Sequence, residues 1–259
     1  MAFEGIILDV DGTVVRDDEP IDGAAEGLDA VADAGLERVF VSNNPTAVPA
    51  AYEARFERAG LTVDREEVLT AGTATTAYLR AEHAADRLFL VGADGVADQL
   101  AAAGLSLTDD PVAADALVAS IDPEFGYDSL CAAIVALEDP ETDFVGTDPD
   151  MLIPQAGPDI PGSGAMIHAI EGVTERPVEV ICGKPSSHAR ELALEALGVD
   201  AADCLVVGDR LDTDIALGDA GGMTTALVLT GVTDRETLAA APIQPDHVLD
   251  SLAELSTLL

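Results

Sequence analysis

Lysine is almost absent from this sequence. Of the 12 basic residues all are arginine except Lys184, whereas aspartate and glutamate number 49, for a formal net charge of -37. So negative a surface excludes nucleic acid as a partner. An acidic, lysine-poor composition is similar to that of proteins from halophilic organisms. The acidic proteome of these organisms works in molar salt, which screens the repulsion among the negative side chains of each protein. An acidic surface made for a partner is the alternative.

The sequence is also poor in cysteine and has no long apolar run. Its three cysteines, Cys131, Cys182 and Cys204, stand far apart. That spacing argues against a disulfide framework or a zinc site and predicts free thiols in a reducing compartment. No window approaches the length of a membrane span, and no basic segment followed by an apolar one begins the chain. We therefore expect a soluble, cytoplasmic protein that contacts no membrane.

What is present is a regular alternation of short apolar runs and alanine-rich helical patterns. This alternation is typical of parallel βαβ units and predicts an α/β fold. The expected strands cover residues 5–10, 38–43, 87–92, 116–121, 143–147, 178–183, 204–209 and 224–229. The expected helices include residues 22–34, 47–59, 94–103, 128–138 and 187–197.

Four of the expected strands end abruptly in polar residues. The sequences at these ends are LDVDG, VSNNP, ICGKPS and VVGDRLDTD. Ligands of open parallel sheets bind outside the carboxyl ends of the strands, so we expect these four ends to meet at one edge of a sheet. The first two precede residue 45 and the others follow residue 180. Residues 81–178 contain strands without such ends and are interpreted as an inserted second domain.

The pair Asp9 and Asp11 poses a question of charge. Residues two apart on a strand point to the same side, so the two carboxylates repel each other unless something holds them together. A divalent cation would do so. A surface loop that merely solvates both acids is the other reading of these residues.

The four polar segments together resemble the ordered motifs of the haloacid dehalogenase (HAD) superfamily. These segments are DVDGT at 9–13, SNN at 42–44, GKP at 183–185 and GDRLDTD at 208–214. The match is closest to the NagD-like and p-nitrophenylphosphatase-like phosphatases of subfamily IIA. The resemblance implies a Rossmann-like parallel-sheet core at 1–80 and 179–259, with an inserted α/β cap of the C2 type at 81–178.

The resemblance also implies a reaction and a metal. The family's ligands for Mg²⁺ correspond to Asp9, Asp209 and the backbone carbonyl of Asp11, and magnesium prefers such oxygen ligands. Asp9 would be the nucleophile that forms an aspartyl-phosphate. Asp11 would protonate the leaving alcohol and later accept a proton from the attacking water.

The remaining motif residues would surround the phosphate. Lys184 and Ser42 would stabilise its oxygens and complete the catalytic set. Asp214 would orient Lys184 or a metal-bound water. The substrate-binding residues would be Gly12, Thr13, Asn43 and Asn44, with the amides of the first two pointing inward. A lone lysine placed inside one of the motifs favours a function for it.

Other functions stay open at this point. The same fold carries phosphomutase, ion-pump-like and dehalogenase chemistry, although dehalogenases lack an acid at the position of Asp11. A catalytically silent protein that binds a phosphate ligand is a further alternative. The substrate would be a small phosphorylated metabolite whose leaving group is read by the cap, through Asp148 or an arginine such as Arg176 or Arg210. A homodimer through the cap is also expected.

Overall fold

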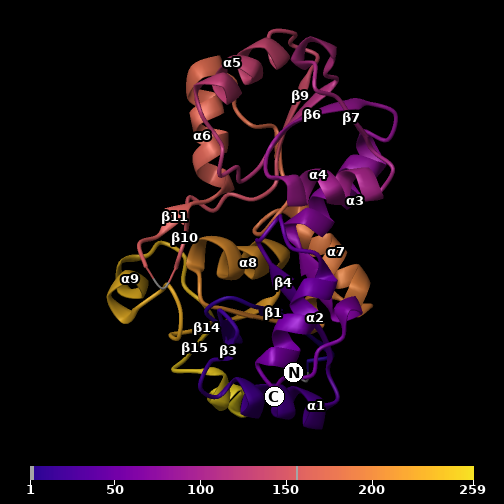
Figure 1. The fold of residues 1–259 in the computed structure, drawn as a ribbon. Helices are drawn as coiled ribbons and strands as arrows, with labels where there is room; N and C mark the ends of the chain where they lie inside the picture. The colour runs from indigo at the N-terminus through magenta and orange to yellow at the C-terminus, as the bar shows by residue number, and fades with distance from the viewer. Residues whose placement is uncertain (1–2, 156) are drawn as a thin grey trace. The chain divides into compact units, whose positions relative to one another are not determined.

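The computed structural model describes residues 3–155 and 157–259, which form two compact units, each built on its own parallel sheet. The first unit comprises Met1–Ser42, Pro49–Leu69 and Lys184–Leu259, and the second comprises Asn43–Val48 and Thr70–Gly183. The chain thus leaves the first unit and returns to it, as an insertion requires (Figure 1). The assignment of these parts to a catalytic core and a cap stays a prediction.

The first unit is organised around a six-stranded sheet. Its order is β15-β14-β13-β1-β4-β5, and the pairs from β15 to β4 are parallel. Every residue of β1 and β13 is buried, as in parallel sheets that helices cover on both faces. The strands are β1 (Gly5–Asp9), β4 (Glu37–Ser42), β5 (Val68–Thr70), β13 (Cys204–Gly208), β14 (Thr224–Val228) and β15 (His247–Leu249).

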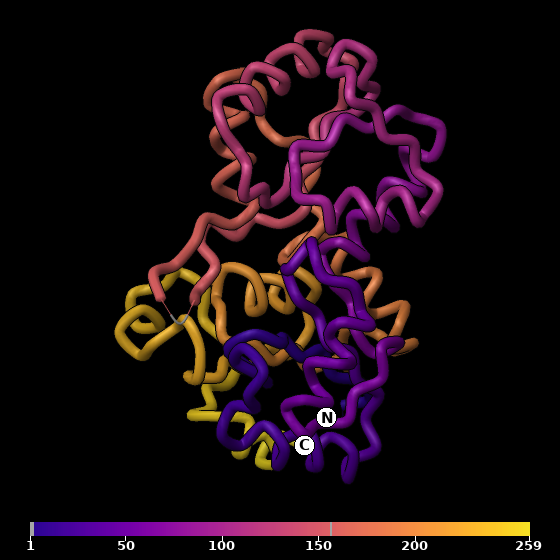
Figure 2. The backbone as a smooth tube through the Cα atoms, in the orientation of Figure 1, coloured from indigo at the N-terminus to yellow at the C-terminus, as the bar shows by residue number. Residues whose placement is uncertain are grey.

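Within its described residues, this unit has five α-helices. They are α1 (Ala24–Ala34), α2 (Pro49–Arg58), α7 (Ser187–Leu197), α8 (Ala216–Gly221) and α9 (Arg235–Ala240). The hydroxyl of Ser186 accepts a bond from the N–H of Ala189, which caps α7, and this helix packs on β1 and β4. Helix α1 packs against the 3₁₀ helix η5 (Leu252–Thr257) near the end of the chain (Figure 2).

Short hairpin and helical elements directly precede or follow the strands of the same sheet. The hairpin of β2 (Val15–Arg16) and β3 (Glu19–Pro20), which we call the flap, follows β1 directly. The helical turn η4 (Leu211–Ile215) follows β13 and leads into α8. Two 3₁₀ turns, η1 (Arg65–Glu67) and η3 (Ala201–Asp203), precede β5 and β13.

The second unit has a five-stranded parallel sheet in the order β12-β9-β8-β6-β7. Its core gathers Leu117, Phe144, Ile167 and Ile170. The strands are β6 (Arg87–Val91), β7 (Ser106–Leu107), β8 (Ala116–Ala119), β9 (Asp143–Gly146) and β12 (Val180–Ile181), with a separate hairpin of β10 (Leu152–Ile153) and β11 (Ile160–Pro161). The helical elements are α3 (Ala71–Glu82), α4 (Asp94–Ala102), α5 (Tyr127–Ala136), α6 (Ser163–Thr174) and the turn η2 (Pro111–Ala113).

The predicted α/β class with parallel sheets is confirmed, and each expected strand overlaps an observed one. One placement was wrong. The expected strand 178–183 contributes only β12, which pairs with β9 in the sheet of the second unit. The second unit also begins earlier and ends later than residues 81–178, because α3 packs on α4 and β12 joins β9. Among the residues that the structure describes, no helix is long and apolar enough to cross a membrane.

Candidate active site

Three of the four predicted motif segments meet at the carboxyl edge of the six-stranded sheet. Asp9 is the last residue of β1, which lies between β13 and β4. Asp209 directly follows β13, and Ser42 ends β4. Since these neighbouring strands are parallel, their ends fall at the same edge, as the sequence predicts.

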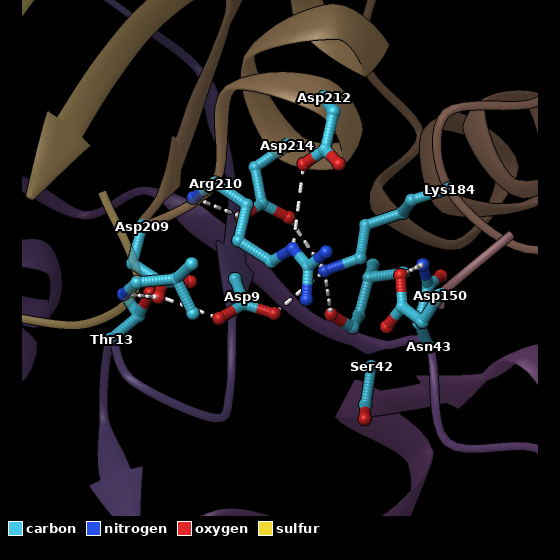
Figure 3. Close-up of polar contacts among 12 residues, drawn as sticks. Asp9, Thr13, Ser42, Asn43, Asp150, Lys184, Asp209, Arg210, Asp212 and Asp214 are labelled. Carbon is cyan, nitrogen blue, oxygen red and sulfur yellow. Dashed lines mark hydrogen bonds and ion pairs between the residues drawn. The ribbon is translucent and has the colours of Figure 1, made fainter. Parts of the chain in front are cut away.

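Lys184 reaches this edge by a different route from the predicted one. It follows β12 of the other sheet and precedes α7, so the GKP segment does not follow a strand of the six-stranded sheet. Its side chain is nevertheless buried beside Asp9. The ammonium donates to Asp9 Oδ1 at 2.6 Å, to the carbonyl of Val41 at 2.7 Å and to Asp214 Oδ1 at 2.7 Å (Figure 3). Lys184 thereby joins the ends of β1 and β4 to η4.

Both carboxylate oxygens of Asp9 have a donor. While Lys184 contacts Oδ1, the fully buried hydroxyl of Thr13 donates to Oδ2 at 2.9 Å. Asp214 is held on both sides as well, because its Oδ2 accepts from the N–H of Arg210 at 3.0 Å. The orientation of Asp9 and Asp214 is therefore fixed by hydrogen bonds from several segments of the first unit.

Negative charge exceeds positive charge inside the site. Burial raises the pKa of Asp9 well above its usual value, an effect that Lys184 opposes and Asp214 reinforces. Burial, and next Asp214, also raise the pKa of Asp209, to about 7. Burial by itself would lower the pKa of Lys184, but Asp214 and Asp9 outweigh it, so that pKa is raised and the ammonium stays charged.

The donor set fits a divalent cation. Asp9, Asp209 and Asp214 each place a carboxylate oxygen within 4.8 Å of the others, and all three are buried. One buried ammonium faces these three acids, so in their ionised forms two negative charges would need a further cation. Among the described residues, Asp209 Oδ1 is buried without a hydrogen-bond partner. A buried, unpaired carboxylate oxygen is costly unless a cation binds it.

Asp11 lies in a different environment from Asp9. Its side chain is 52% exposed, and Oδ1 accepts from the guanidinium of Arg55 on α2 at 2.6 Å. Arg55 also donates to the carbonyl of Asp17 in the flap. An arginine from a neighbouring helix therefore holds the carboxylate of Asp11 and the flap together.

Two predicted contacts of the phosphate-binding residues differ in the structure. The N–H of Gly12, expected to point at a phosphate, donates to the carbonyl of Val15 at 3.0 Å, because the chain turns sharply here with a φ of 92° at Gly12. The hydroxyl of Ser42 lies 2.8 Å from that of Tyr52 on α2. Substrate binding by Gly12 and Thr13, and catalysis by Ser42, stay predictions.

Asn43 and Asn44 belong to the second unit. The amide of Asn43 donates to Asp150 Oδ1 at 3.2 Å. The side-chain oxygen of Asn44 accepts from the N–H and the hydroxyl of Thr46, which makes it the anchor of the turn before α2. Their predicted role in substrate binding stays a prediction.

Two of the three side chains expected to recognise the leaving group, Asp148 and Arg176, form hydrogen bonds within the second unit, whereas Arg210 belongs to the first unit. Asp148 is 2% exposed, and its carboxylate accepts from the hydroxyl of Thr147 and from the N–H of Asp150. Arg176 donates to backbone carbonyls that follow α5 and to Glu179. Asp148 and Arg176 are therefore built into the packing of this unit.

Sequence reasoning missed three contributors to the site. Arg55 and Tyr52 lie on α2, 44 and 10 residues along the chain from their partners Asp11 and Ser42, and the sequence pattern does not reveal these contacts. The third is a backbone group, the N–H of Val232, which donates to Asp209 Oδ2 at 2.6 Å. Only the glycine at 231 hints at a close approach there.

Two family profiles match this chain. The profile described as haloacid dehalogenase-like hydrolase matches residues 6–106, and one described as HAD-hydrolase-like matches residues 181–255. The sugar-phosphatase AraL of Bacillus subtilis is 32% identical over 254 residues, which cover 98% of this chain and 92% of that protein. The chain belongs to the haloacid dehalogenase-like hydrolases.

Solved structures of HAD proteins agree with this assignment. A p-nitrophenyl phosphatase from Archaeoglobus fulgidus has a TM-score of 0.92 and 34% identity, with 100% of both chains covered. NagD from E. coli K-12 has a TM-score of 0.88 and 29% identity, with 98% of both covered. A glycerol phosphate phosphatase from Mycobacterium tuberculosis, solved with magnesium, has a TM-score of 0.87 and 28% identity, with 99% of this chain and 78% of that one covered. The predicted resemblance to NagD-like and p-nitrophenylphosphatase-like HAD enzymes is confirmed, as is the prediction of a HAD phosphatase.

Proposed function

We propose that this HAD enzyme is a magnesium-dependent phosphatase that hydrolyses small phosphate monoesters through an aspartyl-phosphate on Asp9. The observation that carries the proposal is the buried set of Asp9, Lys184 and Asp214 beside the unpartnered Oδ1 of Asp209. Phosphoryl transfer needs an oriented nucleophile and positive charge beside the phosphoryl oxygens. Asp9 is held as the nucleophile, Lys184 provides one positive charge, and Asp209 Oδ1 is placed to bind a cation that would provide more.

In the first half-reaction a carboxylate oxygen of Asp9 attacks phosphorus and the bond from phosphorus to the ester oxygen breaks. Asp11 gives its proton to the departing oxygen, so that an alcohol leaves. Lys184 keeps its positive charge beside Asp9 and stabilises the negative phosphoryl oxygens. Because the ion pair with Arg55 leaves Asp11 ionised in the structure, Asp11 must release Arg55 and bind a proton from solvent before it acts as the acid.

In the second half-reaction a water attacks the phosphorus of the aspartyl-phosphate. Asp11 takes the proton of this water, and the bond between phosphorus and Asp9 breaks to release inorganic phosphate. Thr13 and Lys184 return the carboxylate of Asp9 to its starting orientation through the hydrogen bonds at Oδ2 and Oδ1. Asp214 orients Lys184 throughout.

Asp9, Asp209 and the backbone carbonyl of Asp11 would hold the magnesium ion. When bound there, magnesium supplies charge neutralisation at the phosphoryl oxygens. Asp214 also belongs to the acidic cluster, but its two oxygens already accept from Lys184 and Arg210. We therefore assign it an orienting role.

We propose the cellular environment of the enzyme from its amino-acid composition. The net charge of -37 and the single lysine support a salt-rich cytoplasm, and the three free cysteines support a reducing one. The proposed substrate class is a small phosphorylated metabolite. A homodimer through the cap stays a prediction.

The proposal is tested by phosphate release from p-nitrophenyl phosphate in molar salt, with and without Mg²⁺. We expect release that requires the metal and is abolished in Asp9→Asn. Folded wild-type protein that releases no phosphate at any salt concentration would leave ligand binding as the better account. A panel of sugar phosphates, phosphoglycolate, nucleoside monophosphates and pyridoxal phosphate would then identify the ester.

A further inference from the structure

The carboxylate of Asp209 is held asymmetrically. Oδ2 accepts from the N–H of Val232 at 2.6 Å, whereas Oδ1 is buried without a partner among the described residues. A carboxylate that can rotate freely would share its donor between both oxygens. Here one oxygen is fixed by the backbone and the other is presented to the interior of the site.

The donor belongs to a four-residue loop, 230–233, that follows the end of β14. The N–H of Thr233 donates to the carbonyl of Asp209 at 3.2 Å, and the hydroxyl of Thr230 donates to the carbonyl of Gly12 at 2.7 Å. The loop is thus tied at one end to the residue after β13 and at the other to the turn after β1. These are the two segments that provide Asp209 and Asp9.

Two glycines make room for the carboxylate between these segments. A Cβ at Gly231 would lie 1.8 Å from Asp209 Oδ2 and 2.4 Å from its Cγ. A Cβ at Gly12 would lie 2.6 Å from the same Oδ2, and Gly12 has a φ of 92° that disfavours other residues. A side chain on either residue would therefore push the carboxylate of Asp209 out of its present orientation.

We propose that loop 230–233 is the positioning element of Asp209: Val232 fixes Oδ2, Gly231 leaves it space, and Oδ1 is thereby directed at the divalent cation. This inference rests on the proposed function, because it assumes the magnesium site. Under this inference the loop residues control the affinity for the metal although they do not contact it. Such an effect is expected of groups that orient a metal ligand.

The loop also connects the metal ligand to the flap. The guanidinium of Arg16 in β2 donates to the carbonyl of Thr230 at 2.6 Å. Since this bond uses the backbone of Thr230, changes of the Thr230 side chain leave it in place. Variants at Thr230 can therefore separate the bond to Gly12 from the bond to the flap.

The test measures Mn²⁺ binding by electron paramagnetic resonance, without substrate, in wild type and Gly231→Ala. We expect Gly231→Ala to remain folded by circular dichroism and to bind Mn²⁺ about 10- to 100-fold more weakly. Gly172→Ala is the matched control, since a Cβ there meets nothing within 4 Å and should leave the affinity unchanged. A folded Gly231→Ala protein with wild-type affinity would overturn the inference.

A second pair of variants keeps the inference falsifiable if Gly231→Ala fails to fold. Thr230→Val removes the bond to Gly12 and should weaken Mn²⁺ binding severalfold, while Thr230→Ser keeps the hydroxyl and should restore it. Equal affinities in both variants would contradict the inference. A wild-type protein that binds no divalent cation would instead defeat the proposed function, so the two failures are distinguishable.

Discussion

Each unit of this HAD enzyme buries acids after the strands of a parallel sheet, and the partners of those acids differ. Asp9, Asp209 and Asp214 in the first unit surround one buried ammonium, and one carboxylate oxygen has no partner among the described residues. Asp148 in the second unit follows β9 and is surrounded by hydroxyl and N–H donors. The charge that acts on its pKa is that of another acid, Asp150.

This difference in surroundings indicates a different role for the buried acids of each unit. Burial, and next Asp150, raise the pKa of Asp148 to about 7, so this carboxyl is largely protonated in mildly acidic solution and needs no cation. The pKa of Asp209 in the first unit is raised to the same value, so the difference lies in the surroundings: three buried acids share the ammonium of Lys184, and Asp209 Oδ1 has no hydrogen-bond partner among the described residues. A cluster of buried acids in which one carboxylate oxygen lacks a hydrogen-bond partner therefore indicates the reactive site. A buried acid whose oxygens accept hydrogen bonds from neighbouring groups indicates a structural role.

The largest expected difference between the two environments is in turnover. Asp9→Asn should lower the rate of phosphate release by at least about 10⁴-fold, because it removes the nucleophile. Asp148→Asn is the matched control, the same change at the buried acid of the other unit, and should keep most of the activity. Comparable losses in both variants would erase the distinction.

A substitution of Asp11 tests whether acid–base catalysis can be separated from metal binding. Asp11→Asn should lower kcat by about 10²- to 10⁴-fold, because both half-reactions lose their proton carrier. Since its carbonyl and the carboxylate of Asp9 remain, Mn²⁺ affinity should stay near that of wild type. Unchanged turnover in Asp11→Asn would remove this residue from the acid–base role.

Asp148 makes the stability of the protein depend on pH. Its pKa is about 7 in the folded protein and near 3.8 in the unfolded chain, so the folded state binds the extra proton between these values. Stability from this group is full below pH 4 and is lost as the pH rises through 7, by on the order of 4 kcal/mol. Urea unfolding of wild type and Asp148→Asn in EDTA from pH 4 to 8 measures it. A stability difference between the two proteins that does not change with pH would contradict the assignment.

The smallest expected effect is that of salt, which acts on the surfaces of both units. Lowering salt from about 1 M to about 0.1 M lengthens the screening distance from roughly 3 to 10 Å and restores repulsion among the acids. We expect a loss of about 1 kcal/mol or more, which lowers Tm by roughly 2–4 °C in a chain of this size. Full thermal stability in dilute buffer would argue against salt adaptation.

The strands of the first unit could be predicted because buried parallel strands are nearly all apolar and end where a polar residue follows. Asp9, Ser42 and Asp209 were placed at one edge for this reason. Lys184 could be singled out because it is the only lysine. The sheet to which β12 belongs could not be predicted, since two residues of strand carry no signal of their partner.

Contacts made by the backbone or over long stretches of chain escaped prediction. The N–H of Val232 and the space beside Gly231 have no side-chain signature that points to Asp209. The ion pair of Arg55 with Asp11 joins α2 to the loop after β1, and any of the arginines could have been its cation. Helix α3 was missed because its threonines weaken the helical pattern.

Diffraction from crystals soaked in Mn²⁺ tests the central claim most directly, because anomalous scattering locates the ion without reference to activity. The account predicts one strong peak in the first unit, about 2 Å from a carboxylate oxygen of Asp9 and from Asp209 Oδ1. An ordered Asp9 and Asp209 with no peak between them, or a peak held by other residues alone, would contradict it.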